Sequence, residues 1–445
     1  MTLERDKPLL AVVGFNLLTL FVFITAPVAW QTDNLFAVCV FVLFCQVMVV
    51  LGFGLGEYGG RVAPIAKLPF FEAEGLMRLL FSVYVLTFPV FYAYRLEFAP
   101  FDIAGMFARL LAGVADPQFA YSSTLNKTSQ GPIPWSVFFA VAVFNQLFFA
   151  AGFLRWRKMG LPLRILFSSL VLIELFYWVG IATTFGVVAL VTTWGLSTMF
   201  WKGRAAQATF SSQARTLALL TLLLIGSIAF FSYNLYRRSN YVQLDVEQFQ
   251  TLQAVQAPLI GDHLAFSIVP QSLWPTYLMV VSYLAQGYYH TAFAFDLDFR
   301  STGFLGNNPA LISLAGAFGI SVWDDSYMHR LHARGIDEYG VWHSAYTWWA
   351  SDVSFYGVPV VLFLLGYLFG FSWAQGRRGD FLSRIVFIIF GNMLLFLFAN
   401  NTYLASVFYA FMVFVPFWLF TRFAAALQGS GRSEVEMLLP NRSRD

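Results

Sequence analysis

Long apolar runs, separated by short polar segments, are the most regular feature of the chain. Each run has about 20 residues, the length that a helix needs to cross the hydrocarbon core of a bilayer. A helix satisfies its own backbone hydrogen bonds there, so the runs predict membrane-spanning helices. We expect ten of them, over residues 8–30, 34–56, 77–96, 135–154, 164–181, 183–200, 216–236, 354–375, 385–399 and 402–421.

Two long segments interrupt this series, at 97–134 and 237–353. The first carries apolar residues at helical spacing opposite two charged residues, which predicts an amphipathic helix lying on the membrane surface. The second contains the apolar pieces 277–285 and 310–320, which are too short or too interrupted to count as spans. If both pieces crossed the membrane, the total would be twelve.

Composition favours a membrane protein over a soluble one. Hydrophobic residues make up 58% of the 445 residues and charged residues 11%. With a mean hydropathy of +0.66, a soluble globule of this size has no core large enough to bury the apolar fraction. The first run is too long for a signal peptide, so we expect it to be retained. The predicted fold is an all-α integral membrane protein, a polytopic bundle of about ten helices.

The distribution of Lys and Arg sets the orientation, because cytoplasmic segments keep the excess. With the N-terminus inside, 19 of the 27 Lys and Arg residues are cytoplasmic, both termini are inside, and both long segments are external. The chain then divides into an N-terminal bundle (1–236), a large external loop (237–353), C-terminal helices (354–421) and a cytoplasmic tail (422–445). The net charge of +3 reflects the basic cytoplasmic face and does not support nucleic-acid binding.

The large loop concentrates the residues that can carry chemistry. All five histidines fall between His263 and His343, and histidine is the side chain that transfers protons most readily near neutral pH. The loop is acidic overall, with ten carboxylates, five arginines and no lysine. Arg330 and Arg334 are four residues apart, so on a helix both guanidinium groups project from one face and can hold a phosphate from two sides. Arg300 can supply a third cation.

His343 follows Arg334 by nine residues. Gly335 and Gly340 lie between them and let the chain fold back, so the imidazole can act as a base beside an anion clamp. A structural histidine with satisfied hydrogen bonds is an open alternative. The arginines can equally form structural ion pairs with acidic neighbours, namely Asp324, Asp325, Asp337 and Glu338.

A metal site is the competing interpretation of the histidines. His329 and His332 are three residues apart, and together with Asp324, Asp325 or His343 they can bind zinc or a harder cation. The aromatic residues nearby also have two interpretations, a membrane-interface belt or flat platforms for sugar rings beside an anion site. These residues are Tyr288, Tyr289, Trp342, Tyr346, Trp348 and Trp349.

Two stretches of the C-terminal half resemble a known family. They are SYLAQGYYHTAFAFDLDF (282–299) and VWHSAYTWWASDVSFYGVPVVLFLLGYLFG (341–370), with the two arginines between them. The combination resembles the bacterial oligosaccharide repeat unit polymerases, the Wzy-type O-antigen and capsule polymerases, which are similar in plan to the O-antigen ligases. The resemblance implies that Arg300, Arg330 and Arg334 hold a lipid-linked pyrophosphate and that His343 activates the acceptor hydroxyl.

The resemblance also implies a function and its partners. It implies a glycosyltransferase of the bacterial inner membrane that joins undecaprenyl-pyrophosphate-linked repeat units into O-antigen or a related polysaccharide on the periplasmic face. The lipid-linked oligosaccharide and membrane lipid are the expected ligands. A chain-length regulator and a flippase are the expected protein partners, and no cofactor is required. A ligase that moves glycan to a lipid core would use the same residues. A transporter would place ionisable groups within spans, where Glu174 is the only clear candidate, which argues against transport.

The predicted orientation can be tested with reporter fusions. An enzyme that is active only outside the cytoplasm should be active when fused near residue 120 or 250, and silent near 60, 160, 208 or 380, because the basic residues are retained inside. Activity is measured in whole cells, with fusion-protein levels as the control. A silent fusion near 250 would place the histidines in the cytoplasm.

Overall fold

The computed structural model is helical throughout most of the residues that it describes. Besides helices, these residues include one antiparallel pair, β1 (Thr251–Leu252) and β2 (Ala257–Pro258). An isolated bridge joins Val28 to Leu259. The described residues are 3–65, 74–96, 101–117, 119–122, 135–183, 185–201, 226, 251–252, 257–336, 343–399 and 401–438.

The helices are α1 (Leu3–Ile24), α2 (Leu35–Val62), α4 (Glu74–Leu96), α5 (Ile103–Ala115), α7 (Trp135–Arg155), α8 (Leu161–Gly180), α9 (Phe185–Thr198), α11 (Leu264–Ile268), α12 (Trp274–Ala294), α13 (Pro309–Ala317), α14 (Tyr327–His332), α15 (Ala345–Arg377), α16 (Phe381–Leu395) and α17 (Asn401–Leu438), with the 3-10 turns η1 (Trp156–Lys158) and η3 (Gln271–Leu273).

Six of the described helices are long and apolar enough to cross a membrane, in agreement with the predicted helical membrane class. Their apolar segments are Asp6–Ile24, Leu35–Val62, Glu74–Ala93, Leu161–Gly180, Ala345–Arg377 and Val407–Ala425. This number does not confirm the predicted ten to twelve spans. The predicted spans 183–200 and 385–399 correspond to shorter apolar helices, α7 covers 135–154, and 216–236 lies outside the described residues.

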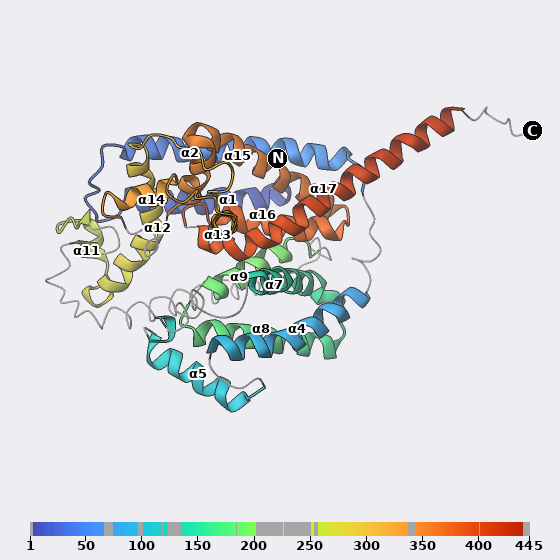
Figure 1. The fold of residues 1–445 in the computed structure, drawn as a ribbon, viewed down its shortest axis with the longest axis horizontal. Helices are drawn as coiled ribbons and strands as arrows, with labels where there is room; N and C mark the ends of the chain where they lie inside the picture. The colour runs from blue at the N-terminus through green and yellow to red at the C-terminus, as the bar shows by residue number, and fades with distance from the viewer. Residues whose placement is uncertain are drawn as a thin grey trace, which may run out of the picture.

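The helices form two layers (Figure 1). In the main bundle, α1, α2, α15, α16 and α17 run side by side, and α12 and α14 pack at one end. The side layer consists of α4, α5, α7, α8 and α9, and it joins the main bundle through α7 against α17 and α9 against α16. The C-terminal part of α17 extends beyond the bundle, so the predicted tail begins as helix.

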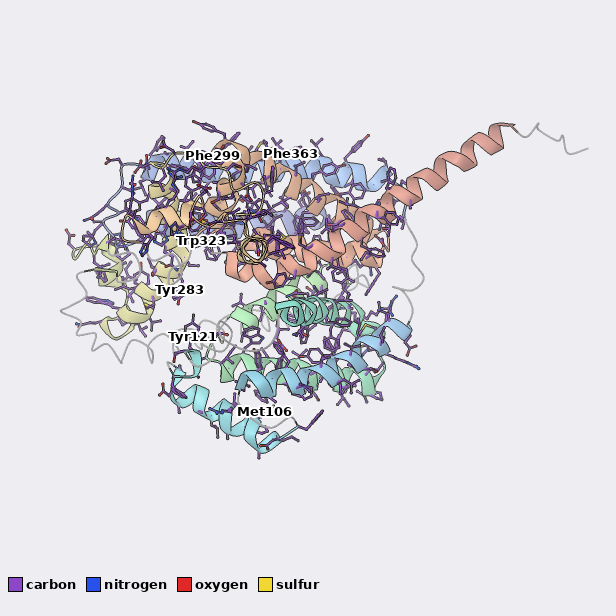
Figure 2. All side chains as sticks on the ribbon, viewed as in Figure 1. Met106, Tyr121, Tyr283, Phe299, Trp323 and Phe363 are labelled. Atoms are coloured by element: carbon purple, nitrogen blue, oxygen red, sulfur yellow. The ribbon has the colours of Figure 1, made fainter. Side chains whose placement is uncertain are left out.

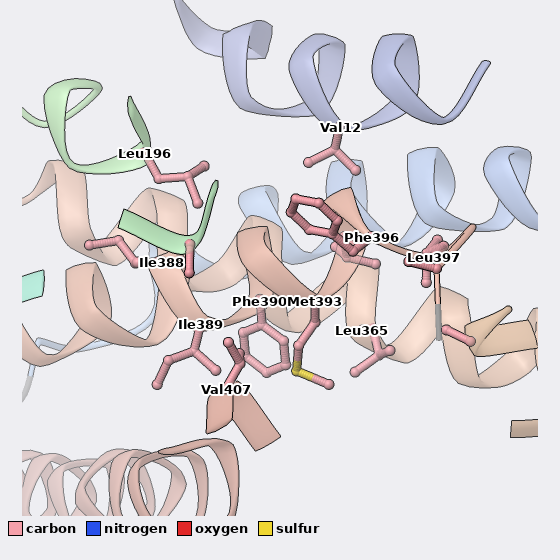
Figure 3. Packing of buried hydrophobic residues seen from close by; sticks show 14 of the residues in the cluster. Val12, Leu196, Leu365, Ile388, Ile389, Phe390, Met393, Phe396, Leu397 and Val407 are labelled. Atoms are coloured by element: carbon pink, nitrogen blue, oxygen red, sulfur yellow. The ribbon is translucent and has the colours of Figure 1, made fainter. Parts of the chain in front are cut away.

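Helix α16 lies at the centre of the main bundle and is buried along almost its whole length. Figure 3 shows Phe390 and Met393 of this helix among side chains of α1, α15 and α17. A helix surrounded by protein on all sides is apolar all round, which is the pattern of its sequence. The chain turns at 396–399 while still buried, and the Leu397 carbonyl accepts a hydrogen bond of 2.9 Å from the Ala345 N–H.

Glycines bring α2 and α15 into close contact. Gly52, Gly56 and Gly60 recur every four residues on α2, and Gly366 and Gly370 do so on α15. A Cβ atom at Gly56 would lie 1.9 Å from the Tyr367 carbonyl oxygen, and one at Gly370 would lie 2.2 Å from the Phe53 oxygen. Small residues at this spacing allow helix backbones in a membrane to approach closely. The glycine spacing is already visible in the sequence, although it belongs to no catalytic motif.

Two elements of the predicted large loop belong to the main bundle. Helix α12 is 21 residues long, although only 277–285 is identified as an apolar piece, because Gln286 and His290 follow it and Ser282 lies within it. All three are buried against other parts of the protein rather than in lipid. Helix α15 begins at Ala345 rather than at 354, and non-helical backbone at Ser354 (φ 61°, ψ 168°) divides it in two. Hydropathy alone could not identify these segments, because it does not register polar groups that protein contacts satisfy.

The predicted amphipathic helix of the first long segment is α5. Its N-cap Asp102 accepts a hydrogen bond of 2.9 Å from the Gly105 N–H. Gly113 packs directly on Gly180 of α8, whereas Ile103 and Leu111 are each 68% exposed. The exposed apolar side suits a position at the membrane surface.

The contact between α2 and α15 generates a stability prediction. Gly56→Ala should lower the free energy of unfolding by about 1–3 kcal/mol, since the methyl group overlaps the Tyr367 carbonyl and the helices must separate. Gly54→Ala is the matched control, because a Cβ atom there meets no atom within 4 Å and alanine favours the helix. Thermal unfolding in detergent measures both. Equal melting temperatures would show that the contact does not limit stability.

Candidate functional site

Helix α14 and the turn after it hold two of the candidate arginines against the chain that follows α12. Arg330 lies on the helix, and Arg334 directly follows its C-cap Ala333. The helix starts at the N-cap Ser326, and Gly335 (φ 81°) ends the turn beyond it. The Arg330 guanidinium donates a hydrogen bond to the Asp298 carbonyl oxygen, and Arg334 Nη1 lies 3.0 Å from Asp296 Oδ2. Both guanidinium groups therefore lie on the side of α14 that faces residues 296–298.

Arg300 extends this arrangement to a third cation. Its Nη1 atom lies 4.0 Å from Asp325 Oδ1, and the Arg300 side chain is 59% exposed. We call Arg300, Arg330 and Arg334 the arginine cluster. Ion pairs as exposed as those of Arg300 and Arg334 contribute at most about 1 kcal/mol each, so a phosphate of higher charge can displace the carboxylates.

The structural alternative for the arginines predicted different partners. Of the four acids that we expected, Asp325 pairs with Arg300, and Asp324 lies 3.8 Å from His329 Nε2. Asp337 and Glu338 lie outside the described residues. The partners of Arg330 and Arg334 come instead from the segment after α12, some 30 residues earlier in the chain.

Tyr327 forms the inner wall beside Arg330. The side chain is 3% exposed, and the Arg330 guanidinium carbon lies 5.8 Å from its ring centroid, within the range of a cation–π contact. Burial raises the pKa of the Tyr327 hydroxyl, while the charge of Arg330 acts in the opposite direction and that of Asp298 adds to the increase. The hydroxyl therefore stays protonated and can act as a hydrogen-bond donor.

A buried carboxylate organises the loop that carries Arg300. Asp352, on the first part of α15, accepts hydrogen bonds from the Thr302 hydroxyl, from the Gly306 N–H at 2.9 Å and from the Asn307 amide at 2.6 Å. The side chains of Thr302, Asn307 and Asp352 are each at most 4% exposed. Neutral donors thus replace the hydration of the carboxylate and fix the loop to α15.

His343 is buried beside a second histidine. It directly precedes the N-cap of α15, and its ring centroid lies 5.2 Å from that of His290 on α12. Each histidine is 1% exposed. Thr291, Ser344 and Thr347 form a hydroxyl cluster next to the pair, with oxygen separations of 2.7–3.1 Å. The candidate base is therefore in the interior, directly before α15 and beside α12, and the segment after α12 carries the arginine partners Asp296 and Asp298.

The aromatic candidates lie mostly in the core. The Tyr288 hydroxyl lies 2.8 Å from the Thr19 hydroxyl, and the Tyr346 hydroxyl accepts a hydrogen bond of 2.9 Å from Gln46. Both tyrosines are completely buried, as expected of packing residues rather than sugar platforms. Tyr289 and Trp348 are 4% exposed and contact Trp30 and Trp323. Trp342 lies outside the described residues.

Trp323 is a half-buried aromatic residue that lines a pocket. Figure 2 shows it in the main bundle, and its ring centroid lies 6.2 Å from that of His329. It lines a pocket of about 320 Å³ together with Ile312, Gly316, Gly319, Ile320, Ser321 and Val322. Sequence reasoning did not single out Trp323, because an isolated tryptophan carries no motif.

The metal interpretation gains no support from the described side chains. His329 reaches Asp324 at 3.8 Å. Within the part of the chain that the structure describes, no group of three or more His, Cys, Asp or Glu is arranged to hold a metal ion. The arginine cluster and the histidine pair are therefore the candidate functional groups among the described residues.

Comparison with known proteins provides no independent assignment. No protein family, curated protein or solved structure matches the chain.

The Asp352 contacts predict a local effect of substitution. In Asp352→Ala, the Gly306 amide should exchange its hydrogen about 10-fold faster or more, since a hydrogen bond to a charged group contributes about 1.5–3 kcal/mol. Hydrogen–deuterium exchange with mass spectrometry over 301–307 measures this effect. Asp324→Ala is the control, because its side chain is 71% exposed and lies outside the loop. Unchanged exchange in Asp352→Ala would mean that the carboxylate does not hold the loop.

Proposed function

We propose that this protein is a membrane glycosyltransferase that polymerises undecaprenyl-pyrophosphate-linked oligosaccharide repeat units into O-antigen or a related surface polysaccharide. The observation that carries the proposal is the arginine cluster. Arg330 and Arg334 bind the segment after α12, which also carries Arg300, and the ion pairs of Arg300 and Arg334 are exposed, so that an anion can replace them. Several guanidinium groups along one segment suit a pyrophosphate better than a single carboxylate.

The chemistry requires only groups that these residues provide. The acceptor hydroxyl gives its proton to an imidazole nitrogen of His343, and its oxygen bonds to the anomeric carbon of the donor sugar. The bond from that carbon to the pyrophosphate oxygen breaks, and the arginines stabilise the charge of the departing pyrophosphate. No nucleotide is consumed, because the lipid-linked donor is already activated.

A lipid-linked substrate also fits the surroundings of the arginine cluster. Phe304, which follows Arg300 by four residues, is 67% exposed, and Phe318 and Ile320 beside the Trp323 pocket are 76% and 49% exposed. Apolar side chains around a cationic surface match an amphiphile with an anionic head group. In this proposal the arginine cluster faces the periplasm of the inner membrane, with ten or more spans and both termini in the cytoplasm. Membrane lipid, a flippase and a chain-length regulator are the expected partners.

Two alternatives use other features of the chain. A ligase that transfers finished glycan to a lipid core would use the same arginines and histidine. A transporter of lipid-linked saccharide is favoured by Glu174, which is 4% exposed within the α8 span and accepts hydrogen bonds from Tyr84 at 2.6 Å and Trp178 at 2.8 Å. Glu174 lies in the side layer rather than with the arginines, which makes transport the second choice.

The saccharide ladder of cells with and without the protein separates these functions. A polymerase is expected to convert lipid-linked single repeats into polymer, so cells lacking it should retain single repeats only. Cells lacking a ligase should instead accumulate lipid-linked polymer. Cells lacking a transporter should accumulate the repeat on the cytoplasmic face.

The same ladder tests the arginines. Arg330→Ala and Arg334→Ala should lower polymer formation about 10²-fold, and Lys variants should be clearly impaired because they lose the bidentate geometry. Arg78→Ala is the matched control, since Arg78 forms an exposed ion pair with Glu74 in the side layer. If both Ala variants made polymer of wild-type amount and length at normal protein levels, the arginines would have only a structural role in ion pairs.

A further inference from the structure

His290 has no role in the reaction described above, yet it is the aromatic neighbour of the proposed base. Its ring lies at 49° to that of His343, with centroids 5.2 Å apart, and both side chains are 1% exposed. The two residues come from different helices, α12 and the start of α15. The separation is therefore set by tertiary packing.

The contact between α12 and α15 is fixed on both sides of His290. Three residues before it, Gly287 lets α12 approach so closely that a Cβ atom would lie 2.1 Å from the Phe398 carbonyl oxygen and 3.1 Å from the Ser344 nitrogen. One residue after it, the Thr291 hydroxyl lies 2.7 Å from that of Ser344. His290 and His343 are thus held between two close contacts, which restricts both imidazoles.

Two imidazoles at this distance in a buried site interact electrostatically. A proton on one ring repels a proton on the other, because little water is present to screen them. Two sites coupled in this way take up one proton more readily than two and titrate as a unit. If the first proton can reside on His290, His343 stays neutral and able to accept a proton.

We propose that His290 is a positioning residue for His343, which orients the base and shares its proton. The inference rests on the proposed function, in which His343 removes the proton of the acceptor hydroxyl. It adds a second histidine to that site, so that the base depends on α12 as well as on the start of α15. His290 acts through His343 and does not itself contact the substrate.

Other titratable or charged groups on the packed elements must be held constant in any test. They are Tyr288 and Tyr289 of α12, Tyr346 and Asp352 of α15, Cys39 and Cys45 of α2, and Arg330 of α14. Several already have partners: Tyr288 bonds to Thr19, Tyr346 to Gln46, and Asp352 to Asn307. A comparison of two proteins that differ only at residue 290 leaves them all in place.

The first test measures the pair without any transfer assay. Nitrogen-15 NMR of histidine-labelled protein in detergent follows each imidazole against pH, with assignments from single His→Gln variants. His290→Gln should change the titration curve of His343, and His343→Gln should change that of His290 by the same amount, because coupling is reciprocal. His332→Gln, at an exposed position on α14, should leave both curves unchanged. Independent curves for His290 and His343 would overturn the inference, and either variant suffices if the other does not fold.

The second test measures the role in transfer. A positioned base increases the rate of the reaction about 10² to 10⁴-fold, and His290→Gln should lower the transfer rate about 10-fold. The acid limb of its pH–rate profile should also move to higher pH, because the first proton can then bind only to His343. A purely structural role would lower the rate without moving the limb, and that outcome would overturn the inference.

The two tests also distinguish this inference from the proposed function. Coupled titration curves in a wild-type protein that transfers no repeat unit would overturn the proposed function and, with it, the role of His290 in transfer. Active wild-type protein with independent curves would overturn the role of His290 alone.

Discussion

The close contact between α2 and α15 is the constraint on which the rest of the structure depends. Helices in a membrane gain little from burying apolar surface against each other, so they associate where small residues allow backbone contact. Glycines on both helices provide this contact from Gly52 to Gly60. At the far end, Gln375 donates a hydrogen bond of 2.7 Å to the Gly60 carbonyl. Because α15 is fixed along this length, the short segment before Ser354 has a rigid base.

That short segment, 345–353, connects the interior to the surface. His343 and the Ser344 cap directly precede it, and its end carries Asp352, which holds the loop of Arg300. The segment packs against α12, whose own continuation supplies Asp296 and Asp298 to the arginines on α14. One pair of elements thus positions both the buried histidines and the exposed arginine cluster. In the proposed reaction, the base and the anion site would therefore keep a constant geometry.

The two sites differ in a way that suits their proposed tasks. The arginines are partly exposed and weakly paired, so a charged head group can exchange with their carboxylate partners. The histidines are buried, where charges interact more strongly because water does not screen them. The side layer has its own buried polar group, Glu174, bonded to neutral donors from Tyr84 and Trp178. The separation of Glu174 from the arginine cluster is why we assign it no part in glycan transfer.

The sequence by itself determined the helical membrane class, because apolar length is a local property that each segment carries alone. It also predicted the amphipathic helix Ile103–Ala115, since helical spacing places its apolar residues on one side. The predicted helix through Arg330 and Arg334 ends at His332, and contacts with Asp298 and Asp296 hold the two guanidinium groups against the same segment. Only the tertiary structure decided that α12 is a core helix, that Tyr288 and Tyr346 pack inside, and that Asp352 holds the loop of Arg300. The same holds for the pairing of His290 with His343. These features depend on contacts between distant residues, and the burial of a polar side chain depends on partners that no local pattern specifies.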